Sequence, residues 1–507
     1  LTIILQLHHD SHHHSRPAAS AHATHPCAQP HAQPSLLANM SVVPLVFSVL
    51  AGIATTLIAA LGINLFARLL PTRYHAAENP KDDHIQILVL GDIGRSPRMQ
   101  YHALSVMKHG GKVDLVGYKE TARHPELVGN ERVALYPLPP LPTVFKWNTL
   151  PFLVNKPAKV IWQAWSIFYV LAYTAPPARW IIIQNPPSIP TLHLALLVSL
   201  LRGSHLLIDW HNYGWSIMAT GRSQKNPLVW LYKKYETYFG RIVPTANLTV
   251  TDAMARQLKE KPYSNRKPIF TLHDRPAEVF QPIESSDARL AFLSRLKETK
   301  GVAQSIIDGT TRLIVSSTSW TPDEDFGLLL DALVAYAHPE EAVTENGVGR
   351  PPILAIITGK GPQKAEYEEK IKNLRLEGKL PGITILTAWL STREYATLLA
   401  CADLGVCLHK SSSGVDLPMK VVDMFGSGLP VAAYSAYESF AELIKEGVNG
   451  CGFETATELA EVLIRLLSES GKDELKNLKV GAVKEGSLRW DEEWDRVVGR
   501  VVGVMDS

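Results

Sequence analysis

The segment from Ser411 to Val431 holds the residues whose types and spacing most favour binding chemistry. Small residues and Gly414 precede Pro418, and proline is common in the first turn of a helix. The backbone N–H groups at such a helix start attract phosphate, and Lys420 adds a positive charge beside them. Asp423 follows one helical turn later and offers a carboxylate to ribose hydroxyls. The segment therefore predicts a nucleoside diphosphate site that comprises Ser413, Gly414, Asp416, Pro418, Lys420 and Asp423.

Two glycine turns with basic residues come directly after apolar runs elsewhere in the chain. Residues 91–94 (GDIG) follow one such run, and Arg95 and Arg98 stand just behind them. Residues 358–362 (TGKGP) have a similar form, with Lys360 between two glycines. Glycine lets a backbone approach a ligand closely, and arginine pairs with phosphate in a bidentate manner. Both turns predict phosphate contacts, and for the first a purely structural turn is the alternative.

Proton transfer chemistry is suggested by residues 208–214 (IDWHNYG), which stand at the end of another apolar run. The carboxylate of Asp209 or the imidazole of His211 would suit a general base acting on a hydroxyl. A helix cap surrounded by core aromatics is the alternative for the same residues. Residues 273–276 (HDRP) lie near a predicted domain crossing, where Arg275 would meet a phosphate or belong to a structural turn.

The elements that must position these residues alternate between apolar runs and amphipathic segments. We expect strands at 85–90, 112–118, 180–184, 205–209 and 246–251, and a second set at 312–316, 353–358, 383–386 and 404–408. Helices are expected at 190–201, 326–337, 363–374 and 392–400, and one that ends at about 109. Continuous apolar strands are typical of parallel sheets that are buried on both faces.

This alternation predicts an α/β protein with two Rossmann-like doubly wound domains that face a cleft. We expect the first domain at 80–280, the second at 305–485 and a C-terminal helix at 486–507. Ligands of such folds bind outside the carboxyl ends of the strands, which is where the motifs described above stand.

An uncharged segment, 41–67, is long enough to cross a bilayer, which takes about 20 apolar residues. A signal peptide is the alternative, but its apolar core is shorter and follows basic residues. Here the basic residues Arg68, Arg73 and Lys81 come afterwards, so the positive-inside rule places the C-terminal bulk in the cytosol. We therefore expect a single membrane anchor at 41–70.

The first 39 residues carry eight of the 19 histidines, mixed with alanine, proline and serine. We expect this segment to be disordered and to be upstream sequence, with Met40 as the start, because Met40 stands directly before the apolar segment. A metal-binding tract is the alternative. Residues 1–39 are therefore left out of the fold prediction.

Composition excludes several classes of protein. Of the 507 residues 46% are hydrophobic and 20% are charged, as in globular proteins, and the net charge of +2 gives no nucleic-acid footprint. The four cysteines form no CxxC pair, which is consistent with a reducing compartment. Two further apolar stretches, 160–173 and 192–201, are too short to span a bilayer. They predict buried core helices, or alternatively an interfacial patch that rests on a membrane.

Seven motifs occur in one order along the chain: GDIGRSPRM at 91–99, QNPPSIP at 184–190, DWHNYG at 209–214, HDRP at 273–276, SSTSWTPDEDF at 316–326, GKGP at 359–362 and SSGVDLPMKVVDMFGSGLPV at 412–431. In this respect the sequence resembles the chitobiosyldiphosphodolichol β-mannosyltransferases over about residues 85–500, and the apolar segment matches as well. The resemblance implies the GT-B fold, GDP-mannose as the donor and dolichyl-diphosphate-linked di-N-acetylglucosamine as the acceptor. It further implies a β-1,4 linkage, formed with inversion on the cytosolic face of the endoplasmic reticulum membrane.

The same resemblance gives roles to the motif residues. Inversion needs one group that deprotonates the acceptor, and Asp209, His211 and Asp92 remain open for this role. The GDP-binding residues would add Gly359, Lys360 and Gly361 to the segment around Lys420, and Gly91, Gly94, Arg95 and Arg98 would face the acceptor diphosphate. No tightly bound cofactor is expected. No motif requires a metal ion, although a divalent cation is left open.

The sequence departs from many retaining GT-B enzymes, which carry two glutamates eight positions apart. Asp423 takes the second position here, but Val415 takes the first. Two alternatives remain. The chain would be a catalytically silent scaffold at the membrane, which the retained Lys360 and Lys420 disfavour, or a transferase for another nucleotide sugar. Other mannosyltransferases of the pathway are candidate partners, although no motif identifies a contact.

Overall fold

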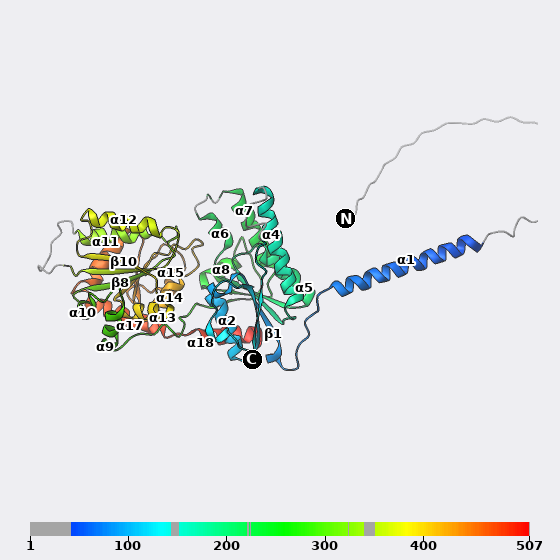
Figure 1. The fold of residues 1–507 in the computed structure, drawn as a ribbon, viewed down its shortest axis with the longest axis horizontal. Coiled ribbons are helices and arrows are strands. Elements are labelled where there is room, and N and C mark those ends of the chain that lie inside the picture. Colours follow the sequence, from blue (N-terminus) through cyan, green and yellow to red (C-terminus); the bar gives the residue numbers. More distant parts are fainter. Residues whose placement is uncertain are drawn as a thin grey trace, which may run out of the picture. The chain divides into compact units, whose positions relative to one another are not determined.

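The computed structural model describes residues 42–142, 152–220, 223, 225–322, 324–338 and 350–505 (Figure 1). The segment up to Leu69 and the body from Leu70 onward are separate units. The first unit contains the helix α1, Val42–Leu69, in which Phe47–Leu69 is long and apolar enough to cross a membrane. This agrees in length and composition with the predicted anchor. The histidine-rich segment and Met40 lie outside the described residues.

The N-terminal part of the body is built on a sheet of seven parallel strands in the order β3-β2-β1-β4-β5-β6-β7. The strand order reverses between β1 and β4, as in doubly wound folds. The strands are β1 His84–Asp92, β2 Lys112–Tyr118, β3 Val133–Pro137, β4 Trp180–Asn185, β5 His205–Trp210, β6 Ala246–Thr249 and β7 Ile269–Thr271.

Helices cover both faces of this sheet because successive side chains of each strand point to opposite faces. In β4, Ile181 and Ile183 join one buried cluster and Ile182 joins the other. The first cluster lies under α4, α5 and α8, with α7 packed against it, and the second lies under α2. The bounds are α2 Pro97–Lys108, α4 Phe152–Tyr169, α5 Thr191–Arg202, α6 Gly214–Ala219, α7 Pro227–Ile242 and α8 Asp252–Lys259.

The C-terminal part repeats the design with six parallel strands in the order β10-β9-β8-β11-β12-β13. These strands are β8 Arg312–Ser317, β9 Ile353–Thr358, β10 Ile383–Ala388, β11 Leu404–Cys407, β12 Val431–Tyr434 and β13 Gly450–Phe453. One face is covered by α9 Ser286–Arg295, α10 Ala303–Ile307, α13 Thr392–Cys401 and α14 Met419–Gly426. The other face is covered by α11 Phe326–Ala337, α12 Lys364–Leu376 and α16 Ala456–Leu467, and two further helices are α15 Phe440–Leu443 and α17 Lys472–Gly486.

The end of the chain returns to the N-terminal sheet. A helical segment runs through α18 Trp490–Trp494, the π-helical η5 Asp495–Gly499 and α19 Arg500–Val502. The side chains of Trp490, Trp494 and Val498 belong to the buried cluster beneath α2. The sequence predicts a C-terminal helix, and the structure adds the surface on which it packs.

The two parallel, doubly wound sheets confirm the predicted fold class. Of the four cysteines, Cys401, Cys407 and Cys451 lie in the described residues, and all three are buried free thiols. Burial raises the pKa of the Cys401 and Cys407 thiols to about 11, so these thiols stay protonated and unreactive.

Candidate active site

The predicted site residues follow strands at the carboxyl edges of both sheets. The loop after β5 contacts the loop after β11. Asn212 Nδ2 of the first loop donates a hydrogen bond to Ser412 Oγ of the second over 3.2 Å. Thr251 Oγ1 also donates to the carbonyl oxygen of Val415 over 2.6 Å. The Val415 side chain is fully buried in the N-terminal cluster beneath α4 and α5. These contacts bring the motifs of the two sheets together.

Lys420, in the first turn of α14, is held by a buried carboxylate. Its Nζ donates to Glu324 Oε1, and Glu324 also accepts from Thr318 Oγ1 at 2.8 Å and from Ser319 Oγ at 2.9 Å. Burial opposes ionisation of Glu324, but Lys420 and these donors hold its pKa below the usual range. The ammonium group is therefore fixed beside the N-terminus of α14. Glu324 was not predicted as a site residue. The only signal for it in the sequence is its place in the motif 316–326.

Asp416 folds the loop in front of α14. Its Oδ1 accepts from the hydroxyls of Ser411 and Ser413, and its Oδ2 lies 3.0 Å from His409 Nε2. Gly414 has a φ of 79°, in the left-handed region that favours glycine. Direct contact of Asp416 or Ser413 with a ligand stays a prediction. In the structure the two residues are partners of each other.

The two glycines of the turn after β9 are required by packing. Gly359 has a φ of 131°, and a Cβ there would lie 1.8 Å from the carbonyl oxygen of Thr318. A Cβ on Gly361 would lie 1.7 Å from the carbonyl oxygen of Ser319. The turn after β9 can therefore approach residues 318 and 319 this closely only because positions 359 and 361 carry no side chain. Lys360 between them is exposed, and its Nζ lies 3.9 Å from the centre of the Trp389 ring.

Asp423 is half-buried on α14. Its carboxylate has no hydrogen-bond or ion-pair partner among the described residues. Burial and then the negative charge of Asp274 raise the pKa of Asp423 to about 8. Such a carboxyl group, without a partner beside the predicted diphosphate site, is available to hydrogen-bond ligand hydroxyls.

The structure corrects the expectation for Arg98. Its guanidinium is only 2% exposed and forms a bidentate pair with Asp209, with Nε–Oδ2 at 2.8 Å and Nη2–Oδ1 at 2.9 Å. Its Nη1 donates to Asp274 Oδ1 at 2.7 Å and to the carbonyl oxygen of Leu272. The guanidinium therefore links β5 to the segment after β7. Because these partners occupy it, it is not free for an acceptor diphosphate.

Asp92 is likewise engaged within the fold. Its Oδ1 accepts from the backbone N–H groups of Gly94, Glu120 and Thr121, and its Oδ2 accepts from Thr121 Oγ1 at 2.5 Å. Burial opposes ionisation of Asp92, but these hydrogen bonds hold its pKa below the usual range. A carboxylate with four donors is a poor general base, so the expectation for Asp92 is not supported.

Around Asp92 the other predicted residues differ in their surroundings. A Cβ on Gly94 would lie 2.5 Å from the carbonyl oxygen of Ala122, so this glycine is required by packing. A Cβ on Gly91 would make only one ordinary contact. Arg95 is 74% exposed, with its Nε 3.6 Å from Asp92 Oδ2, and it is the arginine of this turn that remains accessible.

Asp209 lies at the centre of a hydrogen-bond chain. Besides Arg98, its Oδ2 lies 3.1 Å from His102 Nε2 and 2.9 Å from His211 Nε2. The far nitrogen of His102, Nδ1, accepts from Trp494 Nε1 at 2.9 Å. An indole N–H can only donate, so His102 must carry its proton on Nε2 and donate it to Asp209. Burial lowers the pKa of His102, which keeps this imidazole neutral.

This chain orients His211. The carboxylate of Asp209 stays ionised, because Arg98 and both histidines overcome its burial and hold its pKa well below the usual range. Asp209 is fully buried, which argues against its acting as the base itself. It accepts the N–H of His211 Nε2, so the lone pair of His211 lies on Nδ1. No described residue hydrogen-bonds to that Nδ1, and the side chain is partly exposed beside the Asn212–Ser412 contact.

The motif at 273–276 joins the two domains and the C-terminal helix. His273 lies 3.6 Å from both Glu442 and Glu493, and Arg275 Nη1 lies 3.0 Å from Glu485. Burial opposes protonation of His273, but the two glutamates raise its pKa to about 9. Among the described residues, Asp252, His273 and Glu442 are close enough together to hold a metal ion. In this structure His273 of that cluster forms ion pairs with Glu442 and Glu493.

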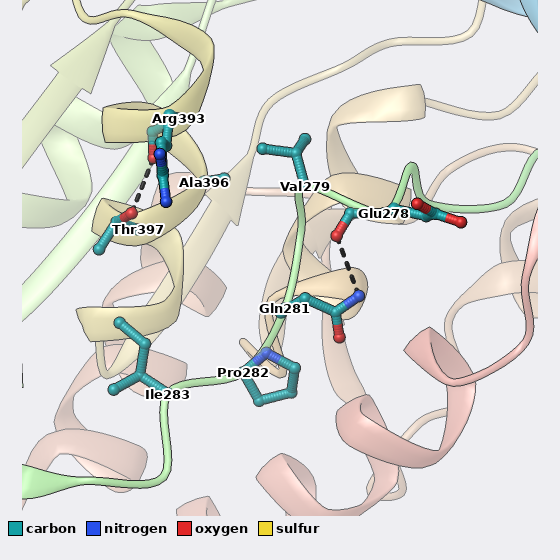
Figure 2. A pocket seen from close by; sticks show the side chains of 8 residues that line it. All are labelled: Glu278, Val279, Gln281, Pro282, Ile283, Arg393, Ala396 and Thr397. Atoms are coloured by element: carbon teal, nitrogen blue, oxygen red, sulfur yellow. Dashed lines mark hydrogen bonds between the residues drawn. The ribbon is translucent and has the colours of Figure 1, made fainter. Parts of the chain in front are cut away.

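A cavity of about 540 Å³ lies between the linker Glu278–Ile283 and α13. Figure 2 shows Arg393, Ala396 and Thr397 on the α13 side of this cavity. One arginine and one glutamate line it, and none of the predicted site residues does. The cavity therefore does not change the assignment of the candidate site.

Comparison with known proteins decides the family. The Glycosyl transferases group 1 family matches residues 303–482. The chitobiosyldiphosphodolichol β-mannosyltransferase of Arthroderma benhamiae is 45% identical over 443 residues, which cover 87% of this chain and 96% of the relative. The protein of the same name from Homo sapiens is 38% identical and covers 82% and 91% of the two chains. The chain belongs to the chitobiosyldiphosphodolichol β-mannosyltransferase family.

Solved structures confirm the GT-B fold of this family member. Anabaena Alr3699/HepE in complex with UDP matches with a TM-score of 0.57 and 14% identity, over 83% of this chain and 100% of that one. Sucrose-phosphate synthase from Thermosynechococcus elongatus matches with a TM-score of 0.56 and 13% identity, over 83% and 98% of the two chains. At such identities the likeness concerns the fold alone.

Proposed function

We propose that the protein transfers mannose from GDP-mannose to dolichyl-diphosphate-linked di-N-acetylglucosamine, forming a β-1,4 linkage with inversion. The observation that carries this proposal is its similarity, over nearly their full length, to relatives that bear that enzyme name. The site supports it, because a helix N-terminus with a fixed lysine and a histidine oriented by a buried carboxylate meet at the domain contact.

Inversion proceeds by one in-line displacement. His211 Nδ1 takes the proton of the acceptor hydroxyl while that oxygen forms a bond to the anomeric carbon of mannose. The bond from that carbon to the diphosphate breaks, and GDP leaves with the electron pair. Asp209 stabilises the imidazolium that forms, in the way a buried carboxylate supports a catalytic histidine.

The negative charge that develops on the leaving diphosphate is met by the start of α14 and by Lys420. Lys360 adds a second cation, and Asp423 accepts hydrogen bonds from the ribose. Arg95 remains for the acceptor diphosphate. A silent scaffold would have no reason to keep Lys420 fixed by a buried glutamate beside a helix N-terminus, so the site favours an enzyme.

The anchor completes the proposal. The candidate span Phe47–Leu69 would hold the body at the endoplasmic reticulum membrane, where the lipid-linked acceptor resides. Basic residues follow the span, which places the body on the cytosolic side.

A transfer assay tests the proposed substrates. Full-length protein in detergent receives an isoprenoid-diphosphate di-N-acetylglucosamine, and GDP-mannose and UDP-sugars are supplied in parallel. We expect one added hexose by mass spectrometry with GDP-mannose alone. Transfer from a UDP-sugar would overturn the donor assignment. No transfer by protein with an intact thermal unfolding transition would favour the silent scaffold.

A further inference from the structure

A buried carboxyl group on α7 lies behind the loop that carries His211. Glu236 is fully buried, and its Oε2 accepts a hydrogen bond from the backbone N–H of Gly214 over 2.8 Å. Gly214 begins α6 and closes the loop that follows β5. The Oε1 atom of Glu236 accepts from the hydroxyl of Tyr263 over 2.6 Å. Glu236 therefore ties α7 to the segment that includes His211.

Glu236 has no cation beside it to offset a negative charge. The titratable side chains packed around it are three phenols: Tyr213, Tyr232 and Tyr263. Burial raises the pKa of each phenol above its usual range, so all three are uncharged. Lys233 Nζ lies over the Trp215 ring, 3.8 Å from its centre, and the negative charge of Glu438 contributes to the raised pKa of Tyr213. Burial raises the pKa of Glu236 to about 7, because its hydrogen bonds only partly offset the loss of solvent.

The hydrogen bonds of Ser188 show which form of Glu236 the fold holds. Ser188 is fully buried in the loop after β4, with its Oγ 2.5 Å from Glu236 Oε2 and 2.7 Å from Asn185 Oδ1. The amide of Asn185 presents Oδ1 to Ser188, because its Nδ2 donates to the carbonyl oxygen of Asn212 over 3.3 Å. A hydroxyl has one hydrogen to donate, and an amide oxygen can only accept. Ser188 therefore donates to Asn185 and accepts from Glu236, which must carry a proton.

Asn185 passes this order on to the loop of the candidate base. It is the last residue of β4, and its carbonyl oxygen accepts from the backbone N–H of His211 over 2.9 Å. Its side chain holds the carbonyl of Asn212, the residue that contacts the other domain. A continuous path of hydrogen bonds thus leads from Glu236 to the backbone of His211. It is separate from the chain through Asp209, which ends on the imidazole ring.

We propose that Glu236, as an uncharged acid, is a positioning residue that fixes the loop bearing His211 by donating a hydrogen bond to Ser188. The proposal rests on the proposed function, in which His211 takes the proton of the acceptor hydroxyl. Asp209 orients the imidazole, and Glu236 sets the place of the loop from which that ring projects. When Glu236 loses its proton, it takes the hydroxyl hydrogen of Ser188, and Asn185 Oδ1 is left without a donor.

Steady-state kinetics across pH test this role. Misplacing a catalytic group by about 1 Å can cost about 10²-fold in rate. We expect kcat of the unaltered protein to fall about tenfold as the pH rises through about 7, with an unchanged KM for the donor. A general base gains activity as the pH rises, so His211 by itself predicts no such fall.

Two variants separate the contributions to this fall. Ser188→Ala removes the bond that ionisation of Glu236 would break, so its kcat should be about tenfold lower below pH 7 and should not fall further above it. Glu236→Gln loses the bond from Gly214, which lowers kcat, but its amide still donates to Ser188 and cannot ionise. Its kcat should therefore be constant over this pH range. An unchanged kcat in Ser188→Ala, or a fall with pH that persists in Glu236→Gln, would overturn the proposal.

Thr237→Ala is the matched control on the same helix. Thr237 is buried beside Glu236 in the sequence, and its hydroxyl donates to the carbonyl oxygens of Lys233 and Lys234 within α7. These bonds do not lead to the loop after β5. We expect Thr237→Ala to match the unaltered protein in kcat and in its pH dependence, and a tenfold loss in this variant as well would overturn the proposal.

Thermal unfolding tests the protonated acid without any transfer activity. The pKa of Glu236 is raised from 4.5 to about 7 on folding, so the stability that its proton contributes is full below about pH 4.5 and is lost as the pH rises through about 7. The unfolding temperature of the unaltered protein should fall over this range relative to that of Glu236→Gln and stay level above it. A difference that is constant with pH would overturn the proposal. A difference that changes as expected, in a protein without transfer activity, would support the acid form of Glu236 and count against the proposed function alone.

Discussion

Individual side chains in the candidate site divide into those that face a ligand and those that hold their neighbours. Asp209 and Glu324 belong to the second group, because both are buried and each binds a cation. His211, Lys420 and Asp423 belong to the first. Removing one partner of a buried ion pair costs about 3–5 kcal/mol, because the other charge stays buried. Tests of the site must therefore separate loss of chemistry from loss of folding.

His211→Asn should lower kcat by about 10²–10⁴-fold, the usual contribution of a general base. The KM for the donor should stay the same. Initial rates at varied donor concentration measure both quantities. His205→Asn alters an exposed histidine at the other end of β5 and should be silent. An unchanged kcat in His211→Asn would refute the role of this residue.

Lys420→Ala should lower turnover by about 10²–10³-fold, as when one donor to a developing negative charge is removed. It also leaves Glu324 buried without its cation, so the unfolding temperature should fall. In the double variant Lys420→Met with Glu324→Gln, stability should recover and turnover should not. Lys370→Ala removes an exposed ion pair with Glu366 and a surface contact with the Tyr367 ring, and should change neither quantity. Recovery of turnover in the double variant would show that Lys420 is structural.

The sequence predicts part of this site because some roles are local. Lys420 and Asp423 are placed by one helix, and the motif around Pro418 marks where that helix begins. Arg98 was misjudged because its partner Asp209 is 111 residues away. Residue type alone does not distinguish an arginine awaiting phosphate from one already paired. Glu324 was missed for the same reason, because its lysine lies 96 residues further along.

Among the helices, α18 has a role that its distance in sequence conceals. Trp490 and Trp494 reach back to α2, where Trp490 Nε1 donates to Ser105 Oγ at 3.0 Å and Trp494 Nε1 donates to His102. Only the second bond leads on to Asp209 and His211. The C-terminal helix thus fixes the proton on the candidate base through two intervening side chains.

Trp494→Phe keeps the ring and removes the N–H group. We expect kcat to fall about tenfold, as for other groups that orient a catalytic ligand through hydrogen bonds, while KM stays the same. The acid side of the pH profile should shift, because His102 Nδ1 could then bind a second proton. Trp490→Phe keeps an aromatic ring against Arg98 and His102 and removes only the hydrogen bond to Ser105, which does not lead to Asp209, so rates should be unaffected. Equal effects of Trp494→Phe and Trp490→Phe would show that α18 contributes packing alone and does not orient the candidate base.

Central strands were predicted from sequence more readily than edge strands. β2 and β9 have the expected bounds: β9 is a continuous run of apolar residues and a final threonine, and β2 is buried at every position except its two ends. β3 and β7 were not predicted; they lie at the two edges of the first sheet, where most of their side chains are only half-buried, and β7 is only three residues long. The apolar stretch 160–173 has one face in the core, as predicted, and its other face is exposed, so the interfacial patch stays a prediction.

For the whole molecule, the fold follows from the alternation of elements, but the docking of the two domains does not. The contacts between them come from scattered polar residues such as Thr251, His273 and Glu442. These residues show no periodicity in the sequence. For the motif at 273–276 the sequence left a phosphate contact and a structural turn equally open, and in the structure its arginine and histidine form ion pairs across the domain junction.

The domain junction should weaken at alkaline pH. The pKa of His273 is raised from 6.5 to about 9 in the folded protein, so its ion pairs with Glu442 and Glu493 stabilise fully below about pH 6.5. This contribution is lost as the pH rises through about 9. His273→Gln should lower the unfolding temperature at acidic pH, and the gap to the unaltered protein should close towards alkaline pH. His338→Gln, at an exposed site, is the control. A gap that is constant with pH would contradict the account.

The stereochemistry of the product tests the central claim most directly. The trisaccharide formed from GDP-mannose and the lipid-linked di-N-acetylglucosamine is released and digested in parallel with β-mannosidase and α-mannosidase. The account predicts that β-mannosidase alone removes the added mannose, because a single displacement assisted by His211 inverts the anomeric carbon. Removal by α-mannosidase instead would mean retention and would contradict both the proposed reaction and the role of His211 as its base.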